Sequence, residues 1–181
     1  MGELDNLSSV MRSLWGGLLD TEGMVGTPER VLRHWKEITS GLNEDPSEPL
    51  RKTFSCSHDQ IVVEKDLAFN SLCEHHLLPF FGVAHVGYIP NGRVVGLSKI
   101  PRALDILARR PQLQERLTDS IAEVLMLTLN PLGVAVVMSA EHTCMTTRGV
   151  LKPGSRTLTS CMLGVFRDNA SARQEFMELI K

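Results

Sequence analysis

The stretch IVVEKDLAFNSLCEHHLLPFFGVAHVGYIPNGRVVGL, residues 61–97, decides the fold. It contains two apolar runs, residues 61–69 and 77–90, and this composition predicts strands. The Asn91-Gly92 pair that comes after the second run is a strong signal for a tight hairpin turn, so we expect residues 94–97 to form a third strand. An antiparallel sheet is therefore expected in the middle of the chain.

Helices and two further strands are expected after this stretch. Residues 98–110 and 111–131 predict two helices, and strands are expected over residues 133–145 and 157–166. A last helix is expected over residues 171–180. This order predicts an α+β fold in which antiparallel hairpins pack against helices. The buried stripe of the second helix is expected to contain Leu113, Leu117, Ile121, Val124 and Leu125.

The N-terminal part of the chain predicts a helical arm. Leucine and methionine recur at helical spacing over residues 4–19, and a second helix is expected to begin with Thr27 as its cap and Pro28 in its first turn. The polar stretch NEDPSEP then separates this arm from the rest of the chain. We expect an N-terminal helical arm at residues 1–50 and one catalytic domain at residues 51–181.

Composition excludes several classes of function. The chain has 181 residues, of which 43% are hydrophobic and 22% charged, which is ordinary for a globular protein. A formal net charge of -2 gives no electrostatic reason to expect nucleic acid or a membrane surface as a partner. The start of the chain lacks the pattern of a secretory signal. The longest apolar stretch, residues 77–90, is broken by prolines, glycines and His85, so we expect no membrane span and a cytoplasmic location.

Polar, metal-binding residue types lie between the two apolar runs, at residues 73–76, which read CEHH. Burying such groups is unfavourable unless each has a partner. In a regular strand Cys73 and His76 would point to opposite faces, so both can bind one ion only if a helical turn or a β-bulge bends the chain. His142 and Cys144 are two apart in a predicted strand and should share a face. Cys73, His76 and Cys144 would then supply three ligands to a zinc ion.

The fourth zinc ligand distinguishes a structural site from a catalytic one. Cys161 as fourth ligand would close the site and make it structural. Alternatively, the fourth position belongs to water, and His75 and His142, which adjoin the proposed ligands, would be its proton donors and acceptors. Cytoplasmic cysteines are in either case expected as thiols or metal ligands, not disulfides.

Several motifs, taken together, resemble those of the GTP cyclohydrolase I family. They are SLCEHHLLPFFG, GLSKIPR, RPQLQERLT, EHTCMTTRGV and TSCMLGVFR, and the resemblance covers Thr27 to Lys181. It implies the tunnelling fold, in which subunits of ββααββ type join their sheets into an oligomeric antiparallel β-barrel. It also implies a toroidal homodecamer of two face-to-face pentamers, with active sites between subunits.

The resemblance also assigns roles to individual residues. It implies zinc ligation by Cys73, His76 and Cys144, and catalysis by His75 and His142. It implies triphosphate contacts by Ser98, Lys99, Arg102 and Arg148, and a guanine anchor at Glu115, preceded by Gln114. The sequence has no Walker-type loop, so the start of the SKIPR helix would have to bind the phosphates. Without the resemblance, Lys99 and Arg102 would be better explained as solvated bases on a capped helix, and Glu115 as a solvated carboxylate of an isolated subunit.

The activity implied is zinc-dependent hydrolytic opening of the guanine imidazole ring of GTP. Formate is released, and the product rearranges and cyclises to 7,8-dihydroneopterin triphosphate, the first step of folate or tetrahydrobiopterin synthesis. His142 would protonate a ring nitrogen, and His75 would assist proton transfer as formate leaves. Glu74 either orients a histidine or faces solvent.

Two other functions compete with this one. A nitrile reductase on the same fold would use a nucleophilic cysteine and NADPH, and has no need of the three-ligand set. A non-catalytic zinc-stabilised ring or purine-binding module would need the zinc but neither histidine. Thr21, Asn70 and Cys161 depart from residues common in the family, but none of them is a proposed ligand.

Overall fold

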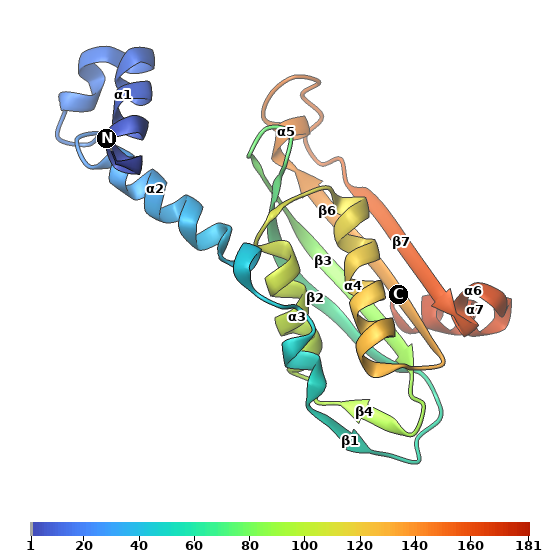
Figure 1. Ribbon diagram of the computed structural model, residues 1–181. Helices are drawn as coiled ribbons and strands as arrows, with labels where there is room; N and C mark the ends of the chain where they lie inside the picture. Colours follow the sequence, from blue (N-terminus) through green and yellow to red (C-terminus); the bar gives the residue numbers. More distant parts are fainter. Residues whose placement is uncertain (1) are drawn as a thin grey trace. The chain divides into compact units, whose positions relative to one another are not determined.

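The computed structural model describes residues 2–181, and the chain divides into two compact units between Ser40 and Gly41 (Figure 1). The first unit contains helix α1 (Glu3–Trp15), a 3-10 turn and helix α2 (Thr27–Ile38). An ion pair between Arg12 and Asp20, 2.9 Å long, ties the end of α1 to the 3-10 turn. The expected helices of the arm are therefore present. Thr27 is the first residue of α2 and not its cap, a position that Gly26 occupies.

The second unit is a mixed α+β structure, as expected. Its curled, five-stranded sheet has the order β5-β2-β3-β6-β7, with antiparallel pairing except between β5 and β2 (Figure 1). The strands are β2 (Val62–Cys73), β3 (Pro79–Ile89), β5 (Pro111–Gln112), β6 (Gly133–His142) and β7 (Thr157–Gly164). The helices are α3 (Lys99–Ala108), α4 (Gln114–Leu129), α5 (Thr143–Thr146), α6 (Val165–Asp168) and α7 (Ala170–Leu179).

The turn at Asn91-Gly92 does not join two neighbouring strands of this sheet. Strand β4 (Arg93–Val95) instead pairs with β1 (Thr53–Ser55), a strand that the sequence did not predict, in a separate two-stranded sheet. The reason is that β2 and β6 already occupy both edges of β3, so β3 has no free edge for β4. The positive φ of Gly92, 74°, then lets the chain turn away from the main sheet.

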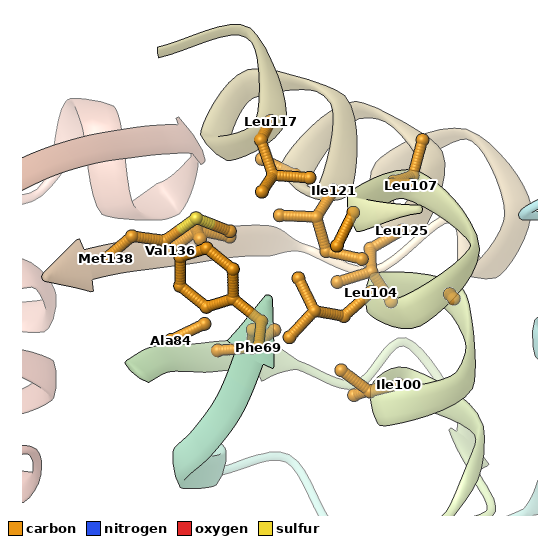
Figure 2. Packing of buried hydrophobic residues seen from close by; sticks show 14 of the residues in the cluster. Phe69, Ala84, Ile100, Leu104, Leu107, Leu117, Ile121, Leu125, Val136 and Met138 are labelled. Atoms are coloured by element: carbon orange, nitrogen blue, oxygen red, sulfur yellow. The ribbon is translucent and has the colours of Figure 1, made fainter. Parts of the chain in front are cut away.

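Alternate residues of the central strands face two separate cores, as the two-residue period of a strand requires. On one face, Val134, Val136 and Met138 of β6 pack against α3 and α4 (Figure 2). On the other face, Ala135 and Val137 pack with aromatic residues of α6 and α7. The first core is the larger and is filled from the helices by Ile100, Leu104, Leu107, Leu117, Ile121 and Leu125.

Helix α4 buries more polar surface than its sequence suggested. Leu117, Ile121 and Leu125 are fully buried as expected, whereas Leu113 and Val124 are only partly buried. Gln114 and Thr118 are instead buried, each 1% exposed. A polar side chain is buried at this depth only where it has hydrogen-bond partners. Those partners come from Thr159 on β7 and from Met138 and His142 on β6.

Candidate metal and catalytic site

A tight turn between β2 and β3 brings Cys73 and His76 to the same side. The Cys73 N–H donates to Leu78 O at 2.9 Å, and the Leu77 N–H donates to Cys73 O at 2.8 Å. Leu77 adopts a left-handed φ of 52°, which completes the reversal of the chain. The Cys73 Sγ consequently lies 4.0 Å from the His76 Nδ1. The bend that a shared ion would require is therefore present, in the form of a turn.

Cys144 reaches the same place from a helical turn and not from a strand. The expectation that His142 and Cys144 share a strand face is wrong, because β6 ends at His142 and Thr143–Thr146 form α5. The ladder stops here because Thr143 comes opposite Pro79, whose nitrogen has no hydrogen to donate. The Thr143 hydroxyl instead donates to the Pro79 carbonyl oxygen. This turn directs Cys144 towards the Cys73 loop.

The ligand atoms of Cys73, His76 and Cys144 all lie within 4.8 Å of one another. Tetrahedral zinc, with bonds of about 2.0–2.3 Å, holds its ligand atoms roughly 3.5–3.8 Å apart, so a small contraction would suffice. Burial raises the pKa of the Cys144 thiol, and the nearby Cys73 raises it further. A bound dication would reverse this effect, because it favours both thiolates. The chain thus contains a group able to bind a metal ion.

Cys161 does not belong to this group. It lies on β7, where it pairs with Val136 of β6. Burial, followed by the neighbouring Asp119, raises the pKa of its thiol to about 11. Among the described residues, the group therefore offers three protein ligands without Cys161, the arrangement that leaves a position for water in catalytic zinc sites.

His142 is held between an aromatic ring and an amide. Its ring stacks on Phe80, with centroids 4.6 Å apart and planes 4° from parallel. Its Nε2 lies 2.8 Å from the Oε1 of Gln114. Burial lowers the pKa of His142, and the charge of Glu115 opposes that shift. Glu115 is exposed at the first turn of α4, as its position off the core stripe predicted.

His75 lies beside the metal ligands and is exposed. Its ring is 6.2 Å from that of His76 and nearly perpendicular to it, at 86°. Arg148, also exposed, lies near Cys144, where its charge acts to lower the pKa of the Cys144 thiol. The loop therefore carries His75 beside its two metal-binding residues, while His142 ends the strand before Cys144 and Arg148 follows the helical turn that contains Cys144.

The other proposed phosphate ligands lie at the opposite end of α3. Ser98 is at the N-cap position of this helix without a side-chain cap bond, and Lys99 and Arg102 occupy its first turn. The C-terminal end of α3 leads into β5, which pairs with Leu72 and Cys73. Ten residues of helix span about 15 Å. The Ser98–Arg102 turn therefore lies at the end of α3 that is remote from β5, the strand that pairs with Cys73.

Several contacts of the site had no signal in the sequence. Phe80 provides the surface on which His142 stacks. Glu74, which was expected either to orient a histidine or to face solvent, forms a two-pronged ion pair with Arg116 at 2.6 and 3.1 Å. The Glu74 N–H also donates to the Gln112 carbonyl at 3.0 Å, so the turn that holds the ligands is tied to the start of α4. Partners so distant along the chain cannot be recognised from spacing.

Comparison with known proteins identifies the family of the chain. Residues 6–181 match the family model of GTP cyclohydrolase I. A GTP cyclohydrolase 1 of Bacillus subtilis is 56% identical over 161 residues, which cover 88% of this chain and 85% of that protein. The protein of the same name from Pelotomaculum thermopropionicum is 57% identical over 163 residues, 90% of this chain and 87% of that one.

A solved structure of an archaeosine synthase QueF-Like resembles 58% of this chain and 94% of its own, with a TM-score of 0.46 and 19% identity. That likeness is too weak to add to the assignment. Within the described residues, no helix has the length and apolar character needed to cross a membrane. The extent of the family match and the identity to two curated relatives decide the question: this chain belongs to the GTP cyclohydrolase I family.

Proposed function

We propose that the chain hydrolyses the guanine imidazole ring of GTP, releases formate and forms 7,8-dihydroneopterin triphosphate. The observation that carries this proposal is the convergence of Cys73, His76 and Cys144 within 4.8 Å, in a chain more than half identical to proteins named GTP cyclohydrolase 1.

We propose zinc as the metal, because two thiolates and an imidazole are the donor set that suits it. Zinc bound by Cys73, His76 and Cys144 would supply activation of a water molecule near neutral pH for attack on the carbon between the two imidazole nitrogens. His142 donates a proton to a nitrogen of that ring. His75, exposed beside it, assists proton transfer as the formyl group leaves.

Guanine recognition is assigned to Glu115 at the start of α4. Its carboxylate is exposed and close to His142, so a base that contacts one can contact both. A carboxylate accepts two hydrogen bonds from the amide and amino edge of guanine. Adenine cannot donate the same pair, and the carboxylate would be left without partners, so adenine would be rejected strongly.

The triphosphate is assigned to Arg148 and to the first turn of α3, with Ser98, Lys99 and Arg102. That turn lies about 15 Å, the length of α3, from the end of the helix that leads into β5, and we infer that a neighbouring chain supplies it to the site. This supports a site between subunits and a toroidal homodecamer. The outer edge of β7 lacks a partner strand in the described chain, and pairing between neighbours would cover it and close a barrel.

We further propose that the reaction is the first step of folate or tetrahydrobiopterin synthesis and that the protein is cytoplasmic. We also propose that residues 1–50 form the arm and residues 51–181 the catalytic domain.

The test is product analysis with the zinc-loaded, full-length protein. It is incubated with GTP, and formate is quantified beside the fluorescent pterin obtained after mild oxidation. We expect equal amounts of both, their loss in Cys144→Ala, and their retention in the control Cys161→Ala, whose thiol lies outside the metal group. Formate without pterin would contradict the assigned cyclisation, and neither product with zinc bound would contradict the enzymatic proposal.

A further inference from the structure

Gln114 is a buried amide whose hydrogen-bonding groups are all engaged. Its side chain is 1% exposed, although it begins the helix that carries Glu115. The Nε2 donates to Thr157 O and Thr159 Oγ1, each at 3.0 Å, and lies 3.4 Å from Met138 O. The Oε1 lies 2.8 Å from the Nε2 of His142. Neither amide hydrogen is left to contact a substrate.

The chemistry of these partners fixes which way the amide points. The carbonyl oxygens of Met138 and Thr157 can only accept, so the end of Gln114 that faces them must be its NH₂ group. The oxygen consequently faces His142. Because this oxygen can only accept, the Nε2 of His142 must carry a hydrogen. The free nitrogen of the ring is then Nδ1.

Two hydroxyl groups reinforce this direction. Thr118 Oγ1 donates to the backbone oxygen of Gln114 at 2.8 Å. It lies 2.7 Å from Thr159 Oγ1. Since the Thr118 hydrogen is already used, Thr159 donates to Thr118 and accepts from the Gln114 amide. The chain of bonds is ordered from end to end and joins α4, β6 and β7, all of them rigid elements.

We propose that Gln114 is a positioning residue that holds His142 with its hydrogen on Nε2 and so presents Nδ1 to the substrate. The stack on Phe80 sets the plane of the ring, and the amide sets its rotation within that plane. The inference rests on the proposed function and specifies it. A proton taken up from solvent at Nδ1 passes from there to the guanine nitrogen, which leaves a neutral histidine whose Nε2 hydrogen stays bonded to Gln114.

This role differs from a direct contact between Gln114 and guanine, and kinetics separate the two. For the zinc-loaded Gln114→Leu variant we expect kcat to fall about 100-fold with little change in KM, because misplacing a general acid removes a contribution of that order. In a His142→Ala background, the same substitution should cause no further loss. A raised KM with unchanged kcat would overturn the proposal and favour a guanine contact.

Spectroscopy tests the proposal even where Gln114→Leu fails to fold. Solid-state NMR of the zinc-loaded wild type, with ¹⁵N-labelled histidine, reports which ring nitrogen carries the hydrogen, and His142→Asn identifies the signal by its loss. We expect the hydrogen on Nε2, and a partial loss of that preference in Thr159→Val, which removes one anchor of the amide. A hydrogen on Nδ1 alone would overturn the proposal. This readout does not depend on turnover, so failure of the proposed activity would be recognised separately, by the absence of formate.

Discussion

Gly82 is the position at which one methyl group should disturb the site most. It lies on β3 opposite Ala140 of β6, two residues from the Phe80–His142 pair. A Cβ on Gly82 would lie 2.0 Å from the carbonyl oxygen of Ser139 and 2.7 Å from the Cα of Ala140. Real Cβ atoms essentially never approach other atoms closer than 3.0 Å. Both obstacles are backbone, so the two strands would have to separate.

The magnitude depends on this required movement. In a strand, replacing glycine by alanine would ordinarily stabilise by about 0.5–1 kcal/mol. Here the strands must part by more than 1 Å at one contact, and overpacking of this kind costs about 1–3 kcal/mol even where side chains can adjust. We expect Gly82→Ala to lower the free energy of unfolding by about 3 kcal/mol or more. The loss should extend to kcat, because the displaced strands carry Phe80 and His142.

Urea unfolding followed by far-UV circular dichroism, at one protein concentration, measures this effect. Tryptophan fluorescence is unsuitable, since Trp15 and Trp35 both lie in the N-terminal unit. The matched control is Gly96→Ala, whose Cβ would meet only the Lys99 and Phe54 side chains at 3.6 and 3.7 Å. The control should change stability by less than about 0.5 kcal/mol. Equal urea midpoints for Gly82→Ala and the wild type would refute the reasoning.

Two further predictions concern charged residues. Burial raises the pKa of Glu64 to about 7 from 4.5, so the folded state holds its proton more tightly and Glu64 costs stability increasingly as pH rises from about 4.5 to 7. Because Glu64 is only partly buried, Glu64→Gln should stabilise by only about 1–2 kcal/mol at pH 8 and by almost nothing at pH 4.5; equal gains at both values would contradict this. Arg116→Ala removes the ion-pair partner of Glu74. It should weaken zinc binding about 10-fold, as measured by competition with a chelating dye. It should lower the free energy of unfolding in urea by less than about 1 kcal/mol. Arg51→Ala, which breaks an exposed ion pair with Asp45, is the control and should leave zinc affinity unchanged.

The sequence predicted the regular elements well, because their patterns are local. The apolar runs of β2 and β3 and the stripe of Leu117, Ile121 and Leu125 agree with the periods of strand and helix. The Asn91-Gly92 turn was recognised correctly as a turn, but its pairing was not. That pairing depends on which strand edges are already occupied, and this is a property of the whole sheet.

The site divides in the same way. The spacing of Cys73 and His76 predicted a bend, and the bend is present. The helical turn at Cys144 could not be predicted, because it depends on the position of Pro79 across the sheet. The bond between Gln114 and His142 likewise depends on carbonyl groups of two other strands.

Zinc titration tests the central claim most directly. The protein is stripped with a chelator and reloaded in steps, and the rate of formate release from GTP is measured at each step. If Cys73, His76 and Cys144 form one catalytic site per chain, the rate should rise linearly and stop rising at one zinc per chain, with no rise in Cys144→Ala. Full activity of the zinc-free protein, or a linear rise that persists in Cys144→Ala, would contradict the account.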